Sequence, residues 1–281
     1  MTLPVFLSAS EPYATRKEEY WETQNLVNIR AAVRTICAHV LRQGPLVFGG
    51  HPAITPLARG IADRIRHDRQ RDNPGAFAPR LLMFQSRLYV RENPDIADIV
   101  VTDALTAEGE IASSVGSRNL SLLRMRYEML GYEGAEPVHP KLRQYQSQFG
   151  RQRELALFGG QLSPGAPQFR AAFFVGGMEG VIREFRIFRS FHPRTPAYPL
   201  GSTGAAAKLL LKEAGISNAA LNEALERDTA YSLLLEQLLP AAKTKAIAPQ
   251  YLWETGTDAA SYSAADHIDP DELERQITLP P

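Results

Sequence analysis

Cysteine is nearly absent from this sequence, which has only Cys37 among its 281 residues. A single cysteine excludes disulfides within the chain and speaks against a cysteine-based zinc site. Its apolar, helically spaced neighbours favour a buried side chain of no chemical function. We expect no bound metal and no resident cofactor.

Net charge is also absent, because 31 Lys and Arg residues balance 31 Asp and Glu residues. Nothing global therefore draws the chain to duplex nucleic acid or to an anionic membrane. No apolar run reaches the length of a transmembrane helix, and the N-terminal MTLPVFLSASEP lacks the basic flank and long apolar centre of a signal peptide. We expect a cytoplasmic protein.

Strand and helix patterns alternate along the chain, and the content of 44% hydrophobic and 22% charged residues is typical of globular proteins. Short apolar runs predict strands at 3–7, 46–48, 80–85, 96–102, 171–175 and 197–200. Helical spacing predicts helices at 25–41, 54–68, 113–130 and 218–239, with a possible short one at 142–157. This order predicts a three-layer Rossmann-like α/β fold, a mostly parallel sheet with helices on both faces. We expect this domain over 1–215 and a helical extension with a tail over 216–281.

The central stretch is 171–188, AAFFVGGMEGVIREFRIF, in which Gly176 and Gly177 separate a buried strand from a helix. Such a turn aims backbone N–H groups and the positive end of the helix at the space above the sheet, which suits a phosphate. Glu179 and Glu184 lie in or near the first turns, and Glu184 could act on a sugar or a leaving base. The alternative is a simple strand-to-helix joint with two solvated glutamates.

Two earlier strand ends carry similar candidates. Ser8 and Ser10 follow the first strand, where they could contact a ligand or form an N-cap or ST-turn. Gly49 and Gly50 follow the second strand, and His51 after them could bind a phosphate or ribose or be an ordinary turn residue.

Arginines mark one predicted helix, within SVGSRNLSLLRMRYEML. Arg118 and Arg126 share a face, Ser121 lies on the adjacent one, and Arg124 lies away from the first. Together they could hold a phosphate through forked donors, or they could simply cover a solvated helix.

A last small-residue turn follows the strand at 197–200 and contains Gly201, Ser202, Thr203 and Gly204. It would allow a ligand or a neighbouring helix to approach closely, and it lacks the Gly-Lys-Ser/Thr order of a Walker loop. The segment 158–168, FGGQLSPGAPQ, is predicted to be a loop that could cover the site.

Taken together, these features resemble the SLOG superfamily, which includes the lonely-guy phosphoribohydrolases and many nucleotide-ligand domains of prokaryotic defence systems. The resemblance covers about 3–214 and is most specific at SLLRMRYEML and GGMEGVIREF. It implies that Arg126 or Arg124 is a phosphate or ribose ligand and that Glu184 is an acid–base or oxocarbenium-stabilising carboxylate. The sequence departs from the lonely-guy pattern: the glycine turn has one extra residue, no proline precedes it, and Val181 replaces a threonine.

The resemblance implies a sensor or signalling module in a defence or stress system that binds a nucleotide-derived small molecule, forms a homo-oligomer and acts through a separate effector protein. An N-glycosidic hydrolase and an interaction scaffold with a vestigial pocket are the alternatives. The expected ligand-binding residues are Ser8, Ser10, Gly49, Gly50, His51, Arg118, Ser121, Arg124, Arg126, Gly176, Gly177, Glu179, Gly180, Gly201, Ser202, Thr203 and Gly204. Glu184 and Arg126 would be catalytic in an enzyme.

Overall fold

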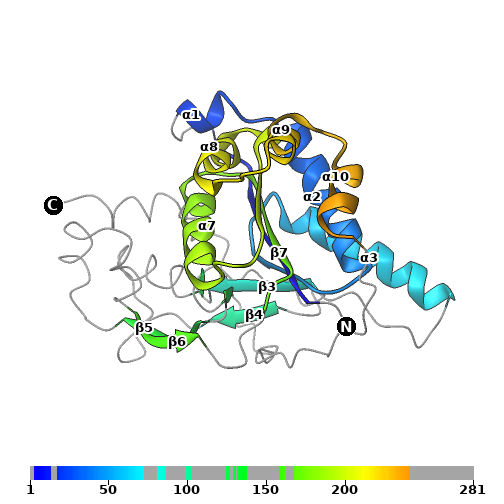
Figure 1. Ribbon diagram of the computed structural model, residues 1–281. Helices are drawn as coiled ribbons and strands as arrows, with labels where there is room; N and C mark the ends of the chain where they lie inside the picture. Colours follow the sequence, from blue (N-terminus) through cyan, green and yellow to red (C-terminus); the bar gives the residue numbers. More distant parts are fainter. Residues whose placement is uncertain are drawn as a thin grey trace. The chain divides into compact units, whose positions relative to one another are not determined.

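Parallel strands between layers of helices form the core of the first of two units in the computed structural model (Figure 1). The structure describes residues 3–13, 18–72, 81–86, 99–102, 125–126, 129–130, 132–137, 158–162 and 168–240. The first unit comprises Met1–Met83 with Pro167–Gln250, and the second comprises Phe84–Ala166 with Tyr251–Pro281. Every contact that builds the candidate site lies in the first unit.

The centre of the sheet is the parallel pair of β1 and β7, flanked by β2 next to β1 and by β8 next to β7. The hydrogen-bonded strand order is β4-β3-β2-β1-β7-β8. The register places Ser8 opposite Phe174 and Ser10 opposite Gly176. The strands of this sheet are β1 (Val5–Ser10), β2 (Leu46–Gly49), β3 (Leu81–Ser86), β4 (Ile99–Thr102), β7 (Ala171–Gly176) and β8 (Ala197–Leu200).

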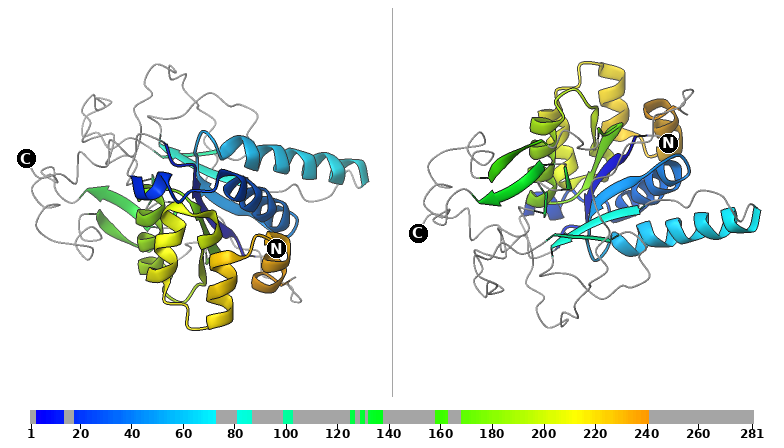
Figure 2. Two further views of the ribbon diagram at one scale, coloured as in Figure 1. Left: turned by 90° about the horizontal axis from the view of Figure 1, so that it is seen from above. Right: turned by 90° about the horizontal axis from the view of Figure 1, so that it is seen from below.

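Helix α7 (Glu179–Phe191) covers one face of β1 and β7, whereas α2 (Leu26–Leu41) covers the other and α3 (Thr55–Asp72) packs beside α2 (Figures 1 and 2). This division follows from right-handed crossovers, because the chain moves from β1 to β2 in one direction and from β7 to β8 in the opposite one. The remaining helices of this unit are α1 (Glu18–Trp21), the 3₁₀ turn η2 (Gly201–Thr203), α8 (Ala205–Ala214), α9 (Ala219–Arg227) and α10 (Tyr231–Leu238). The arrangement confirms the predicted three-layer Rossmann-like class.

Aromatic rings fill the layer between α7 and the sheet. Phe6 stacks on Phe188 with ring centroids 5.6 Å apart and an interplanar angle of 8°. Phe6 also meets Phe174 edge-on at 6.0 Å, and Phe174 meets Phe185 at 5.0 Å. Each such pair contributes about 0.5–1.5 kcal/mol beyond its buried area. Because side chains alternate along a strand, every second residue of β1 from Phe6 onward faces α7.

Three sequence-based boundaries differ from the structure. Ser8 and Ser10 belong to β1 itself, whereas the pattern placed them in the following turn. The predicted loop at 158–168 is wrong for its first half, since β6 (Phe158–Leu162) pairs antiparallel with β5 (Tyr132–Pro137). Glycines made FGGQL read as a loop, and only pairing with a distant segment makes it a strand. The helical pattern at 218–239 forms two helices, α9 and α10.

The break between α9 and α10 has a local cause, because the Asp228 carboxylate accepts a hydrogen bond of 2.7 Å from the Ala230 N–H. Both helices contact elements of the first unit, α10 on α2 and α9 on η2. The expected boundary at residue 215 stays a prediction. Most of the helix predicted at 113–130 and all of that at 142–157 lie outside the described residues. Within the described part, no helix has the length and apolar character needed to cross a membrane.

Candidate functional site

The turn from β7 to α7 has a backbone that only glycine accepts easily. Gly176 and Gly177 have φ angles of +56° and +85°, in the left-handed region. A Cβ on Gly177 would lie 2.3 Å from Cγ2 of Val181, and one on Gly176 would lie 2.5 Å from Cδ1 of Ile29. The Gly177 N–H donates to the Ser10 carbonyl at 2.9 Å, which ties the turn to the end of β1.

Helix α7 begins directly after these glycines without a side-chain cap. Its N-cap residue is Met178, whose side chain makes no capping hydrogen bond. Glu179 follows as the first helical residue, and Gly180 is buried. Among the described residues no backbone carbonyl accepts a hydrogen bond from the Gly180 N–H. The first amides of a helix lack partners within it and carry the positive end of the helix dipole, which interacts favourably with negative charge such as the Glu179 carboxylate in this first turn.

The two serines of β1 face the same helix, since they lie two and four residues beyond Phe6. Ser10 places its Oγ 3.3 Å from where a Cβ of Gly177 would be, at the start of α7. Ser8 is 1% exposed, and its Oγ has no hydrogen-bond partner in the described structure. A buried hydroxyl without a partner costs about 1–3 kcal/mol, so Ser8 is an unusual feature that calls for an explanation.

Ideal strand and helix geometry puts Glu184 about level with Ser8 along the contact between α7 and β1. Helix α7 runs antiparallel to β1, and Phe188 stacks on Phe6. Two residues along β1 from Phe6 advance about 6.6 Å to Ser8. Four residues back along α7 from Phe188 cover about 6 Å to Glu184. Glu184 is 8% exposed and belongs to the buried face of α7 that Val181, Phe185 and Phe188 define.

The turn after β8 is engaged with the protein itself. The Thr203 Oγ1 accepts from the Gly176 N–H at 2.8 Å and donates to the Leu200 carbonyl at 2.6 Å. The Ser202 Oγ is hydrogen-bonded to the Tyr231 hydroxyl at 3.0 Å. Thr203 thus connects the ends of β7 and β8, and we assign it a role in positioning the β7–α7 turn, whereas Ser202 connects the turn after β8 to α10.

Close backbone approach explains the glycine at the end of this turn. A Cβ on Gly204 would lie 1.8 Å from the Thr23 carbonyl oxygen, and its φ is +74°. The Ala206 N–H donates to the Gly177 carbonyl at 3.1 Å, so the start of α8 also supports the glycine turn of β7. Gly201 is buried against α8 and α9.

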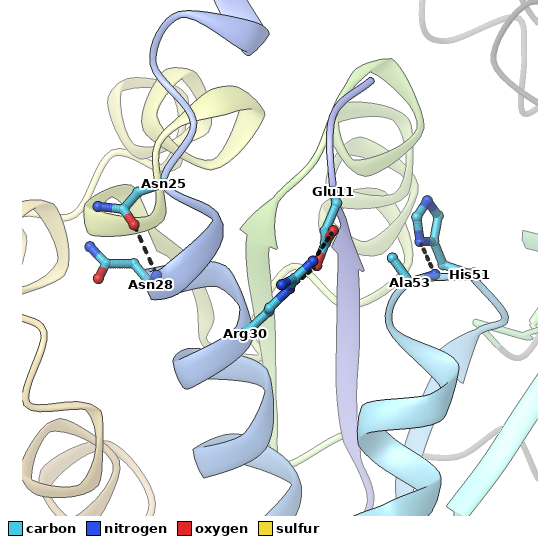
Figure 3. Close-up of polar contacts among 6 residues, drawn as sticks. All are labelled: Glu11, Asn25, Asn28, Arg30, His51 and Ala53. Atoms are coloured by element: carbon cyan, nitrogen blue, oxygen red, sulfur yellow. Dashed lines mark hydrogen bonds and ion pairs between the residues drawn. The ribbon is translucent and has the colours of Figure 1, made fainter. Parts of the chain in front are cut away.

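The second glycine pair differs from the first. Gly49 ends β2 and Gly50 follows it, and neither has a positive φ. His51 is held in place: its Nδ1 accepts from the Ala53 N–H at 3.3 Å (Figure 3), and its own N–H donates to the Thr55 Oγ1 at 3.1 Å. Sequence patterns suggested the same device at both pairs, but only the β7 pair forms a left-handed turn that leads directly into a helix.

An ion pair that the sequence patterns did not indicate fixes the chain after β1. Arg30 reaches from α2 to Glu11, and its Nε and Nη2 donate to the two carboxylate oxygens at 2.7 and 3.1 Å (Figure 3). Glu11 raises the pKa of Arg30, mainly through this hydrogen bond. The two residues are 19 positions apart, so no local spacing signals their contact.

The arginines of the predicted helix are only partly described. Arg118, Ser121 and Arg124 lie outside the described residues. Arg126 belongs to the second unit and is 5% exposed. Their roles as phosphate ligands stay predictions. Among the residues described, no group of three or more His, Cys, Asp or Glu side chains could hold a metal ion.

Among the predicted residues, the structure joins Ser10 to Gly176 and Gly177 at the carboxyl end of β1. Ser8 lies in β1, and Gly180 and Glu184 lie in α7, which packs against β1. Comparison with known proteins gave one finding: the sequence model of the SLOG cluster3 family matches residues 19–136 and 145–239. The match includes the β7–α7 turn and Glu184 and begins after the serines of β1. No curated protein and no solved structure matches the chain. The family match spans most of the sequence, so the chain belongs to the SLOG cluster3 family.

Proposed function

We propose that the carboxyl edge of β1 and β7 binds a nucleotide-derived small molecule and that the protein senses this ligand in a prokaryotic defence or stress response. The observation that carries the proposal is the buried Ser8 hydroxyl, which faces α7 near its uncapped start and has no hydrogen-bond partner among the described residues. The SLOG family supports a ligand-sensing or lonely-guy-like domain in general terms.

The ligand's phosphate would lie at the start of α7. The glycine turn would let the backbone approach the phosphate closely at this point. The Gly180 N–H and the positive end of the helix dipole would favour the phosphate's negative charge. A ligand oxygen would accept a hydrogen bond from the Ser8 Oγ. Because the chain has no net charge, this local arrangement and not the protein surface as a whole would attract the phosphate.

The burial of Ser8 couples ligand binding to a conformational change. Because Ser8 is 1% exposed, a ligand reaches its hydroxyl only when the residues that cover it move. A ligand that binds one arrangement better than the other shifts the population between them, which is the requirement for a sensor. We propose that a homo-oligomer and a separate effector protein read this shift.

The first test is isothermal titration calorimetry of the full chain with mono-, di- and cyclic nucleotides. The decisive variants are Gly177→Ala, which places a Cβ 2.3 Å from Val181, and Gly60→Ala, which meets nothing within 4 Å. We expect Gly177→Ala to lose binding and Gly60→Ala to keep it. Equal affinity in both variants would refute the phosphate position.

An N-glycosidic hydrolase is the second candidate, and the position of Glu184 favours it. A carboxylate that is 8% exposed and level with Ser8 could stabilise an oxocarbenium-like state of a bound ribose. Chromatography of the nucleotides after incubation with the protein distinguishes the hydrolase from the sensor. Release of free base by the wild type that Glu184→Gln abolishes would establish the hydrolase. A nucleotide that binds and stays unchanged would support the sensor. No binding and no product would favour the interaction scaffold.

A further inference from the structure

We propose that Tyr13 is a stacking platform for the base of the nucleotide-derived ligand, a role that rests on the proposed phosphate position. Tyr13 lies three residues beyond the end of β1, and its side chain is 41% exposed. It was not among the residues that the sequence indicated. A large aromatic side chain that is partly exposed at this edge is the kind of surface that binds planar rings.

Tyr13 is held in a defined place by its neighbour. Its ring and that of His51 are near-parallel, with centroids 6.1 Å apart and an interplanar angle of 30°. His51 is itself fixed by the Ala53 N–H on its Nδ1 and by the Thr55 Oγ1 on its own N–H. A platform that is ordered before binding loses less conformational entropy when the base arrives.

The chain between Ser10 and Tyr13 is also restrained. Pro12 fixes one backbone angle, and Glu11 accepts the two hydrogen bonds from Arg30. Figure 3 shows Arg30 and His51 on opposite sides of the chain as it leaves β1. Arg30 therefore restrains the chain two residues before Tyr13, and His51 contacts the Tyr13 ring itself.

The platform lies within reach of the phosphate position. Three residues span at most about 10 Å, which limits the separation of Tyr13 from Ser10. His51 follows β2, and β2 is the neighbour of β1 on the side away from β7. Neighbouring strands are about 4.8 Å apart, so a ligand with its phosphate at α7 would extend across β1 to place its base on Tyr13.

Stacking is tolerant of base identity, because every base has an aromatic face. A stacking role for Tyr13 therefore implies that the ligand is a phosphorylated sugar that carries a planar base. Other residues would determine which base binds. Sugar phosphates without a base would bind at α7 alone.

The test compares probes with and without a base on the full chain. Affinities are measured by calorimetry for ribose 5-phosphate and for the four common ribonucleoside 5′-monophosphates. We expect Tyr13→Ala to weaken binding of the tightest nucleotide about 5- to 150-fold, the range for loss of one stacked base. Ribose 5-phosphate should bind wild type and Tyr13→Ala equally.

Two variants serve as controls. Tyr13→Phe keeps the ring and should keep nucleotide affinity within about twofold, since aromatic stacking does not need the hydroxyl. Trp21→Ala removes another exposed aromatic side chain, 45% exposed on α1, and should change neither affinity. Loss in Tyr13→Phe comparable to that in Tyr13→Ala would overturn the stacking role.

The outcomes separate the two proposals. Tight nucleotide binding that Tyr13→Ala leaves unchanged overturns the platform and leaves the phosphate position intact. Equal loss of ribose 5-phosphate and nucleotide in Tyr13→Ala also overturns it, because the residue would then act on the phosphate end. If wild type binds neither probe, the phosphate position fails and the platform fails with it.

Discussion

Replacing Ser8 by alanine should make the ligand-free protein more stable and the ligand-bound protein less so. In the free protein the Ser8 hydroxyl is buried, and in the described structure it has no hydrogen-bond partner. Removing such a group recovers part of its desolvation cost, which is about 1–3 kcal/mol. Since alanine leaves only the volume of one oxygen unfilled, we expect a net gain of about 1 kcal/mol, or roughly 2–4 °C in melting temperature.

The matched control is Thr203→Val, which removes a buried hydroxyl that does have partners. The Thr203 Oγ1 accepts from the Gly176 N–H at 2.8 Å and donates to the Leu200 carbonyl at 2.6 Å. Valine has nearly the same shape and removes both hydrogen bonds, at a cost of about 1–3 kcal/mol. The two variants should therefore shift the melting temperature in opposite directions.

The assay is thermal unfolding by calorimetry, with and without the nucleotide that binds best to wild type. Ser8→Ala should melt higher than wild type without ligand and gain less from the ligand, because its affinity falls about tenfold or more with the lost hydrogen bond. If Ser8→Ala destabilises the free protein as Thr203→Val does, the hydroxyl has an internal role and the reasoning from its burial is refuted.

Two further predictions concern other parts of the first unit. Burial raises the pKa of the Cys37 thiol from 9.0 to about 12, so the folded protein keeps the proton while the unfolded chain loses it. The contribution of the Cys37 thiol to the free energy of unfolding is fully present below pH 9. It falls by about 1.4 kcal/mol per pH unit as the pH rises from 9 toward 12. Urea unfolding at pH 8 and pH 10 should show this loss in wild type and a smaller one in Cys37→Ala; identical losses would contradict the burial argument. Arg170 donates to the Gln43 Oε1 at 3.0 Å and to the Pro240 carbonyl, next to the end of α10. Arg170→Ala should speed amide hydrogen exchange in α10 about tenfold, whereas Arg34→Ala at an exposed position of α2 should leave it unchanged.

Patterns local in the chain predicted much of the first unit. The buried run before Gly176, the glycine pair and the helical spacing from Val181 to Phe188 placed β7, its turn and α7 at nearly their observed positions. Local patterns work here because burial on both faces of a strand, left-handed turns and helix periodicity each depend on residues close in sequence. The same reasoning failed at β6, where glycines in FGGQL concealed a strand that exists through its partner β5.

The sequence by itself determined the three-layer class and the glycine turn that leads into a helix, because short segments specify both. Only the tertiary structure decided what the polar groups around that turn do. Thr203 and Ser8 are both hydroxyl residues beside predicted strand ends, yet Thr203 bonds two backbone groups while Ser8 has no partner among the described residues. The contacts of Arg30 with Glu11 and of Tyr13 with His51 likewise join separate elements. Whether a polar side chain is satisfied depends on the atoms that packing brings beside it, and no spacing along the chain carries that information.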